Sequence, residues 1–163
     1  FHTVNTCNLR LWTSKPSSEF DLESFQRGDY YRSIEAKQSA ESITAVLYPD
    51  DHTQFGRVLR LKQEYFFVSA TIQDILARLK KRGLHLALLP EYVSIQLNDT
   101  HPSLAIPELM RLLVDEEGCP WGTAWDITQK VFSYTNHTVM SEALEKWPVQ
   151  MISRLLPRHM KVG

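Results

Sequence analysis

The chain has 163 residues, 43% of them hydrophobic and 23% charged, and its 18 Lys and Arg nearly balance its 19 Asp and Glu, for a formal net charge of −1. This composition is typical of a globular domain, and the presence of only 6 Gly and 8 Pro excludes collagen-like and low-complexity sequence. Because the chain lacks net positive charge, we expect no nucleic-acid partner.

Cysteine content and hydropathy also limit the class of protein. Cys7 and Cys119 are far apart, and neither has a second cysteine nearby, so they indicate neither a disulfide framework nor a zinc site and favour a reducing compartment. No apolar run approaches the roughly 20 residues of a membrane span, and no apolar leader opens the chain. We expect a soluble protein without a membrane partner, and a piece of something larger.

The first part of the chain predicts a strand over residues 4–12 and then a polar helix over residues 29–37. In that helix only Tyr30, Tyr31 and Ile34 are available for burial, so we expect it to be either solvated or packed on a partner. A separate short helix is expected over residues 40–47, ending before Pro49, because proline disfavours a helical residue before it.

The strongest periodic signal predicts a long helix over residues 57–82. Its apolar positions alternate in spacing between 3 and 4, which keeps them on one face of a helix; they are Val58, Leu61, Tyr65, Val68, Ile72, Ile75 and Leu79. The basic run 80–82 suits the negative end of the helix dipole, and Gly83 suits a left-handed stop. That basic run therefore needs no ligand to explain it.

Strands alternate with helices in the second half of the chain. Strands are predicted over residues 92–97 and 131–134, and helices over 104–114, 121–130, 141–146 and 149–156. Alternation of this kind predicts an α/β fold in which the strands are parallel and helices flank them.

Polar clusters follow both predicted strands, at residues 98–101 and 136–138. Since ligands bind at the carboxyl ends of parallel strands, the two clusters predict one shared pocket. Helix capping explains part of the pattern equally well, because Asp and Thr before a helix are good caps. A metal site for hydrolysis, built from Asp99, His101 and His137, is a weaker alternative, since no HExxH helix or second acidic cluster supports it.

Other motifs add little to this choice. The triplets 98–100 and 136–138 match the glycosylation pattern, but strand ends inside a crevice are unsuitable acceptors, so we discount both. The chain has no nucleophile elbow around a serine and no glycine-rich phosphate loop. Phosphate chemistry must therefore use another device, or none.

Four stretches resemble the glycogen/starch (α-glucan) phosphorylases: LRLKQEY at 59–65, IQLNDTHPSLAIPEL at 95–109, YTNHT at 134–138 and EALEKWP at 142–148. The resemblance is colinear from about residue 4 to residue 160. It implies that residues 1–163 are a single partial domain, the later part of the N-terminal domain of a GT-B glycosyltransferase with two Rossmann-like domains. The C-terminal cofactor domain is then absent from this chain.

The resemblance also implies an activity. It is the phosphorolysis of terminal α-1,4-linked glucose by orthophosphate, with retention, to give glucose 1-phosphate. The cofactor would be pyridoxal 5'-phosphate, bound by the missing domain, with no cofactor or metal ligand in this chain. The full-length parent would be a cytoplasmic homodimer, or a plastid one if plant-type. The isolated chain is expected to be inactive, and the alternative is a non-catalytic carbohydrate-binding or interaction module.

Site residues follow from the same resemblance. His137 and Asp99 would be catalytic, and Asn98, His101, Asn136 and Thr138 would bind the sugar. Asp50 and Asp51 would lie on a gate loop that closes the catalytic channel. Asp29, Tyr30, Tyr31 and Ile34 would lie on the tower helix, which packs against its counterpart in the homodimer.

Two departures from the animal enzymes have consequences. Residues 52–55 lack the aromatic pair of the animal gate, which puts the inhibitor site on that pair in doubt. Ala77-Arg78 replaces a double arginine that helps to hold the AMP phosphate, so one planar cationic fork is missing. We therefore predict no activation by AMP.

Overall fold

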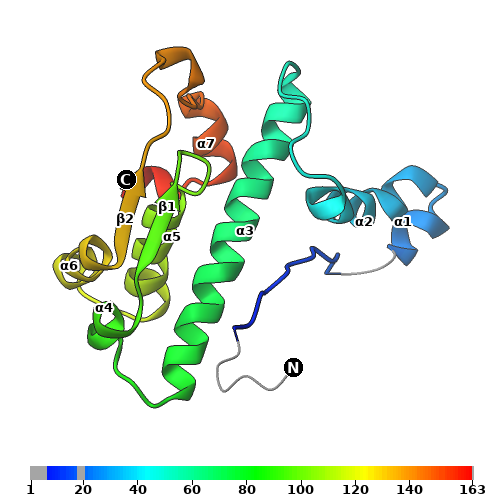
Figure 1. Ribbon diagram of the computed structural model, residues 1–163. Coiled ribbons are helices and arrows are strands. Elements are labelled where there is room, and N and C mark those ends of the chain that lie inside the picture. Colours follow the sequence, from blue (N-terminus) through cyan, green and yellow to red (C-terminus); the bar gives the residue numbers. More distant parts are fainter. Residues whose placement is uncertain (1–6, 18–20, 163) are drawn as a thin grey trace, which may run out of the picture. The chain divides into compact units, whose positions relative to one another are not determined.

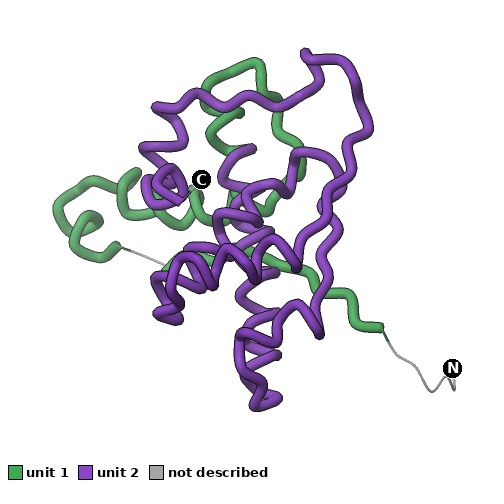
Figure 2. The backbone as a smooth tube through the Cα atoms, turned by 90° about the vertical axis from the view of Figure 1, so that its left-hand side faces the viewer, with its two compact units in different colours: residues 1–59 green, residues 60–163 purple. Residues whose placement is uncertain are grey.

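The computed structural model describes residues 7–17 and 21–162. It divides into two compact units, Phe1–Leu59 and Arg60–Gly163, which Figure 2 distinguishes by colour. We describe each unit by itself. The expectation that residues 1–163 form a single partial domain stays a prediction.

Unit 1 contains a helical hairpin made of α1 (Leu22–Gln26) and α2 (Tyr30–Ala45). Each helix begins at an aspartate whose side chain accepts a backbone N–H of the first turn, Asp21 from Ser24 at 3.0 Å and Asp29 from Arg32 at 3.1 Å. The predicted helix over residues 29–37 is therefore present, but the separate helix over 40–47 was wrong. Nothing breaks the backbone between residues 37 and 40, so α2 is continuous.

The predicted strand over residues 4–12 is not found in its described part. Residues 7–12 have no regular structure, and residues 4–6 lie outside the described part of the chain. Just after this segment, Ser14 binds to α2. Its hydroxyl donates to the Ala40 carbonyl at 2.5 Å, and its N–H donates to the Thr44 hydroxyl at 3.1 Å. This segment pairs with a helix through side chains, which alternation of residue types does not reveal.

The long helix α3 (Gln54–Lys81) confirms the strongest sequence signal (Figure 1). From Arg60 onward it belongs to unit 2, and four of its predicted apolar positions are buried there: Leu61, Val68, Ile72 and Leu79. The helix stops at Gly83, whose φ of +71° is the left-handed conformation that glycine adopts without strain. Its apolar stripe supplies one wall of the core.

The sheet of unit 2 has two parallel strands, β1 (Ile95–Asn98) and β2 (Phe132–Thr135). Ile95 pairs with Phe132, and Asn98 with Thr135. Parallel pairing is therefore confirmed, although β1 starts later than predicted because residues 89–92 form the short helix α4 (Leu89–Tyr92), with Pro90 in its first turn. The chain is a helix-rich α/β protein with a small parallel sheet.

The remaining elements of unit 2 enclose the core. They are η1 (Leu86–Leu88), α5 (Ala105–Arg111), the π-helical η2 (Leu112–Glu116), α6 (Trp121–Val131), η3 (Ser141–Ala143), α7 (Val149–Leu155) and α8 (His159–Val162). Helix α5 packs against α6 and α8, and Leu97, Leu109 and Leu113 are among the buried residues between these elements and α3. Among the described residues, no helix combines the length and apolar character that crossing a bilayer requires.

The predicted helix over residues 141–146 is shorter than expected, since only η3 forms there. Leu144, which ends it, has the extended angles φ −80° and ψ 127°. The backbone cannot return to a helix before Pro148, because proline disfavours a helical residue ahead of it. Residues 144–148 are therefore an irregular segment, and α7 begins directly after Pro148.

Candidate functional site

The carboxyl ends of the two strands lie side by side (Figure 1). Beyond the paired residues Asn98 and Thr135, the Asp99 N–H donates to the Thr135 carbonyl at 2.8 Å. Asp99 then turns the chain with φ +69°, a left-handed conformation that costs most residues energy but that aspartate tolerates. The polar segments 98–101 and 136–138 therefore leave the sheet at the same end.

A side-chain contact joins these two segments directly. The Asn98 amide oxygen and the His137 ring nitrogen Nε2 are hydrogen-bonded. Because an amide oxygen only accepts, Nε2 carries the hydrogen in this contact, and the bond fixes the plane of the imidazole. The Gln96 amide also donates to the Thr135 hydroxyl at 2.7 Å. The structure thus brings together the two strand-end clusters, on an exposed surface in the case of Asn98 and His137.

Other polar residues of the clusters bond locally. The Asn136 side chain accepts the Thr138 N–H at 3.0 Å, and the Thr138 hydroxyl accepts the Met140 N–H at 3.1 Å. These are the turn bonds that Asn and Thr commonly make. These bonds shape the loop that carries His137. The roles of Asn136 and Thr138 in sugar binding stay predictions.

The segment after β1 is held from two sides. The Asp99 carboxylate accepts the Thr100 N–H at 2.7 Å, and the Thr100 hydroxyl donates to the Glu145 carboxyl oxygen Oε2 at 3.4 Å. Asp99, Thr100 and His101 are half-buried. The catalytic role of Asp99 and the binding role of His101 stay predictions, although the turn that carries both lies beside His137.

The metal alternative gains no support from this geometry. Among the described residues, the donor atoms of Asp99, His101 and His137 do not gather within 4.8 Å of one another. The described part of the chain brings only Asp50, Asp51 and His52 together in that way, and all three are exposed. Exposed acidic side chains near one another are common without an ion.

Next to the strand ends lies a carboxyl pair that the sequence did not single out as functional. Arg60 on α3 donates to Glu145 at 2.6 Å and to Glu64 at 3.4 Å. The three side chains are largely buried, with 17%, 14% and 11% of their surface exposed. Burial, followed by the hydrogen bond and the charge of Glu145, raises the pKa of Glu64 to about 8. Glu64 is therefore protonated at neutral pH.

A sequence signal for this pair did exist. Arg60 and Glu64 are one helical turn apart within the phosphorylase-like stretch 59–65, and Glu145 lies within the similar stretch 142–148. What the sequence does not contain is the approach of these two stretches, which depends on the packing of the irregular segment 144–148 against α3.

A second polar cluster, centred on Glu108 of α5, ties three helices together. This fully buried carboxylate accepts from Ser69 of α3 at 2.6 Å, from Arg111 at 2.9 and 3.1 Å, and from His159 of α8 at 2.7 Å. Burial alone would raise the pKa of Glu108, but the bonds from His159, Arg111 and Ser69 outweigh it and lower the pKa to about 2. Glu108 is ionised, and its role is structural.

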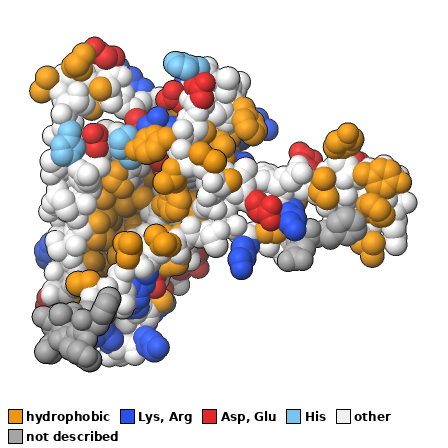
Figure 3. Space-filling view, turned by 45° about the vertical axis from the view of Figure 1, so that its right-hand side comes forward, with side chains coloured by type: hydrophobic (Ala, Val, Ile, Leu, Met, Phe, Trp, Pro, Cys, Tyr) orange, Lys and Arg blue, Asp and Glu red, His pale blue; other side chains and the backbone are white. Residues whose placement is uncertain are grey.

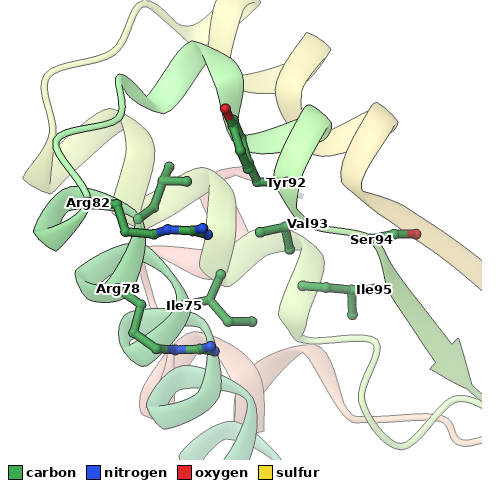
Figure 4. Close-up of a pocket in the computed structure, with 8 residues that line it drawn as sticks. Ile75, Arg78, Arg82, Tyr92, Val93, Ser94 and Ile95 are labelled. Carbon is green, nitrogen blue, oxygen red and sulfur yellow. The ribbon is translucent and has the colours of Figure 1, made fainter. Parts of the chain in front are cut away.

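A hollow of about 260 Å³ opens at the opposite end of β1, between α3 and residues 92–95 (Figure 4). Arg78 of α3 and Arg82, directly after that helix, line it. Both are engaged, since Arg78 pairs with Asp74 at 2.9 Å and the Arg82 guanidinium lies 5.8 Å from the centre of the Tyr92 ring. Because Ile95 is the first residue of β1, this hollow is separate from the strand-end cluster.

The predicted gate residues belong to unit 1. Asp50 and Asp51 are exposed between α2 and α3, and the Asp50 carboxylate accepts the His52 N–H at 2.9 Å. A Cβ on Gly56 would lie 1.7 Å from the Asp50 carbonyl oxygen, so only glycine allows the loop to approach the start of α3 this closely. The gating role of Asp50 and Asp51 stays a prediction.

The predicted tower residues begin α2. Asp29 caps the helix, and Tyr30, Tyr31 and Ile34 are 60%, 88% and 37% exposed. Figure 3 shows hydrophobic side chains gathered over α1 and α2. The exposure of Tyr30, Tyr31 and Ile34 agrees with the expectation that this helix buries few of its residues within its own chain. The packing of these residues in a dimer stays a prediction.

Parallel strands, flanking helices and polar residues at the strand ends define an α/β protein with its candidate site at the carboxyl edge of the sheet. Residues 1–162 match the phosphorylase family, described as carbohydrate phosphorylase. The chain belongs to this carbohydrate phosphorylase family.

Relatives with high identity cover almost all of the chain. It is 59% identical over 162 residues to glycogen phosphorylase 2 of Dictyostelium discoideum and 56% identical over 162 residues to glycogen phosphorylase of Saccharomyces cerevisiae. It is 50% identical over 166 residues to the alpha-1,4 glucan phosphorylase L-2 isozyme, chloroplastic/amyloplastic, of Solanum tuberosum. These alignments cover 99% of this chain and 16%, 18% and 17% of the three relatives. The chain therefore spans less than a fifth of each of these proteins.

Proposed function

We propose that this chain is part of an α-1,4-glucan phosphorylase. The full-length protein transfers the terminal glucosyl unit of a glycogen, starch or maltodextrin chain to orthophosphate, with retention, and releases glucose 1-phosphate. Membership of the carbohydrate phosphorylase family and the names of its relatives support this activity. The observation that carries it is the hydrogen bond between Asn98 and His137, which joins the two polar strand ends. In this proposal the chain is part of the N-terminal domain of a GT-B enzyme.

The strand ends form the glucosyl side of the site. The backbone carbonyl of His137 faces the reacting carbon, where its dipole stabilises the positive charge that develops on the sugar. The imidazole contacts a sugar hydroxyl, and its hydrogen bond to Asn98 holds the ring in plane for that contact. Asp99 lines the same wall, while His101, Asn136 and Thr138 contact the sugar around it.

Pyridoxal 5'-phosphate belongs to the proposal as the group that supplies a phosphate for proton transfer. The residues of this chain do not fit its covalent attachment, which takes a lysine in an enclosed pocket. All eight lysines are described, and each is exposed or half-buried, with Lys80 already 2.5 Å from Glu117. We therefore place the cofactor outside this chain and derive no step through it. The isolated chain then performs no phosphorolysis, even if it retains weak sugar binding.

Two further expectations concern assembly and access. The exposed aromatic residues at the start of α2 support a homodimer in which this helix packs against its counterpart. The aspartates Asp50 and Asp51 support a gate whose negative charge repels incoming phosphate until the loop moves. We propose a cytoplasmic enzyme, with a plastid as the alternative because a potato relative is named chloroplastic/amyloplastic.

A phosphorolysis assay on the full-length protein tests this function. Glucose 1-phosphate is measured after orthophosphate and an α-1,4-glucan are supplied. His137→Ala removes one hydrogen bond to the sugar, which lowers kcat by about tenfold. The matched control is His85→Asn, which changes an exposed histidine that caps η1. An equal rate for both variants would remove His137 from the site, and no phosphorolysis by the unaltered protein would contradict the function itself.

A further inference from the structure

The carboxyl pair Glu64–Glu145 connects α3 to the turn that carries Asp99. Glu145 uses both of its oxygens: Oε1 accepts from Arg60 at 2.6 Å, and Oε2 accepts from the Thr100 hydroxyl at 3.4 Å. Glu64, one turn from Arg60 on the same helix, accepts from that arginine at 3.4 Å, so the two carboxyl groups share one guanidinium. A continuous chain of contacts therefore runs from the middle of α3 to the segment directly after β1.

The single positive charge of Arg60 cannot neutralise two largely buried carboxylates that both bind it. Two carboxyl groups in hydrogen-bond contact share a proton, because both cannot ionise without strong repulsion at close range. Here the proton lets Glu64 donate to Glu145, whose two oxygens accept from Arg60 and from Thr100. Loss of that proton puts two negative charges side by side and pushes Glu145 away from Glu64, along with its hold on Thr100.

We propose that Glu64, Glu145 and Arg60 are positioning residues, which hold the Asp99–Thr100 turn against the strand-end site through a proton shared by the two carboxyl groups. None of the three contacts the sugar. They act through Thr100, which follows Asp99 directly. The inference rests on the proposed function, because the turn matters to catalysis only if the strand ends form the glucosyl site.

The charges around Glu64 determine the pH range over which the two carboxyl groups share a proton. The charged and titratable groups with the largest effect on the pKa of Glu64 are Glu145, on the segment after η3, and Arg60, on its own helix. The cluster around Glu108 is a separate set of contacts, which reaches α3 through Ser69. With the pKa of Glu64 raised to about 8, the shared proton is held at neutral pH and lost on the alkaline side.

The first test is the pH profile of the full-length enzyme. In Glu64→Gln the amide still donates to Glu145 but has no proton to lose. We expect the unaltered enzyme to lose about tenfold in kcat between pH 7 and pH 9, as one ionisation with a pKa of about 8 dictates, and the variant to lose little of it. Glu142→Gln, on the exposed turn η3 nearby, is the matched control and keeps the original profile.

The second test does not depend on activity. Hydrogen exchange of the backbone of residues 98–101 is followed against pH in the same full-length proteins and corrected for the intrinsic pH dependence of exchange. Protection of this segment falls by about tenfold above pH 8 in the unaltered protein and in Glu142→Gln, and stays constant in Glu64→Gln. Residues 121–131 of α6 serve as the internal reference, since the chain of contacts from Arg60 through Glu145 to Thr100 includes none of them.

The outcomes separate the two proposals. An unchanged alkaline limb and unchanged exchange in Glu64→Gln would overturn the positioning role. If the unaltered protein performs no phosphorolysis but the exchange of residues 98–101 follows the expected pattern, the proposed function fails and the shared proton stands. Should Glu64→Gln fail to fold, Thr100→Val breaks the same chain of contacts at its other end. We expect Thr100→Val to abolish the pH dependence of exchange in residues 98–101. If the exchange of this variant still depended on pH, that result would also contradict the proposal.

Discussion

Two glutamates in unit 2 that are shielded from water differ in charge: Glu64 belongs to α3, and Glu108 of α5 packs against it. Glu108 has four hydrogen bonds from Ser69, Arg111 and His159, and its pKa is lowered to about 2. Glu64 faces another carboxyl group as well as an arginine, and its pKa is raised to about 8. Both side chains are removed from water, so the difference comes from the partners and not from burial.

The comparison teaches that burial increases the effect of each partner on the pKa of a carboxyl group. Whether the pKa rises or falls then depends on which partners the group has. Surrounded by donors, Glu108 acts as a fixed anion that holds α3, α5 and α8 together. Beside a second acceptor, Glu64 keeps a proton that it can lose within a few pH units of neutrality. A buried carboxyl group with only donors therefore serves structure, whereas a buried carboxyl pair provides a group that responds to pH.

The largest expected effect follows from removing the charge of Glu108. Glu108→Gln keeps the shape of the side chain, but it turns one end into a donor that faces Arg111 and His159. Breaking a buried, hydrogen-bonded charge network from one side typically costs about 3–5 kcal/mol in the free energy of unfolding. Urea unfolding of the chain measures this loss. A change below about 1 kcal/mol would show that the network contributes little net stability.

The acid side of the stability profile comes next. The folded pKa of Glu108 is below its ordinary value of 4.5, so its contribution is present above pH 4.5 and is lost as the pH falls toward about 2. Thermal unfolding against pH should show this acid limb in the unaltered chain and a flatter one in Glu108→Gln. An identical acid limb in both would mean that other carboxylates cause it.

Glu64 predicts the opposite slope at higher pH. Its folded pKa lies above its ordinary value of 4.5, so the native state holds a proton that the unfolded chain releases, and stability falls as the pH rises from about 4.5 through about 8. Glu64→Gln removes this slope, and the difference in melting temperature between variant and unaltered chain should grow with pH over that range. A constant difference would contradict proton sharing.

The smallest effect is expected at Glu116, which also pairs with Arg111, at 3.0 Å, but is 58% exposed. Water and salt screen such a pair, so Glu116→Gln should change the free energy of unfolding by no more than about 1 kcal/mol. This variant is the matched control for Glu108→Gln, since it removes a charge from the same arginine. A loss as large as that of Glu108→Gln would show that burial is not what separates the two.

The sequence predicted the elements whose signals are local. The alternating 3 and 4 spacing of α3 and the left-handed stop at Gly83 are written in neighbouring residues, and the alternation of strands and helices indicated parallel strands. That same alternation also predicted that residues 98–101 and 136–138 come together, because parallel strands end at one edge. What it could not show was the particular bond between Asn98 and His137.

The features that escaped prediction depend on packing between distant segments. Glu64 reads as a polar helix residue until the irregular segment 144–148 brings Glu145 against it, and Glu108 reads as a solvated acid until His159 of α8 reaches it. The described part of the strand expected over residues 4–12 has no regular structure, and just after it Ser14 bonds to α2. Local patterns give the elements, while long-range contacts decide which polar residues are buried.

A structure of the full-length protein with glucose 1-phosphate tests the account most directly. We expect the hexose to lie at the carboxyl ends of β1 and β2, with a sugar hydroxyl within hydrogen-bond distance of the His137 ring and the Asn98–His137 bond retained. A hexose bound elsewhere, with residues 98–101 and 136–138 free of it, would contradict the central claim that these strand ends hold the glucosyl unit.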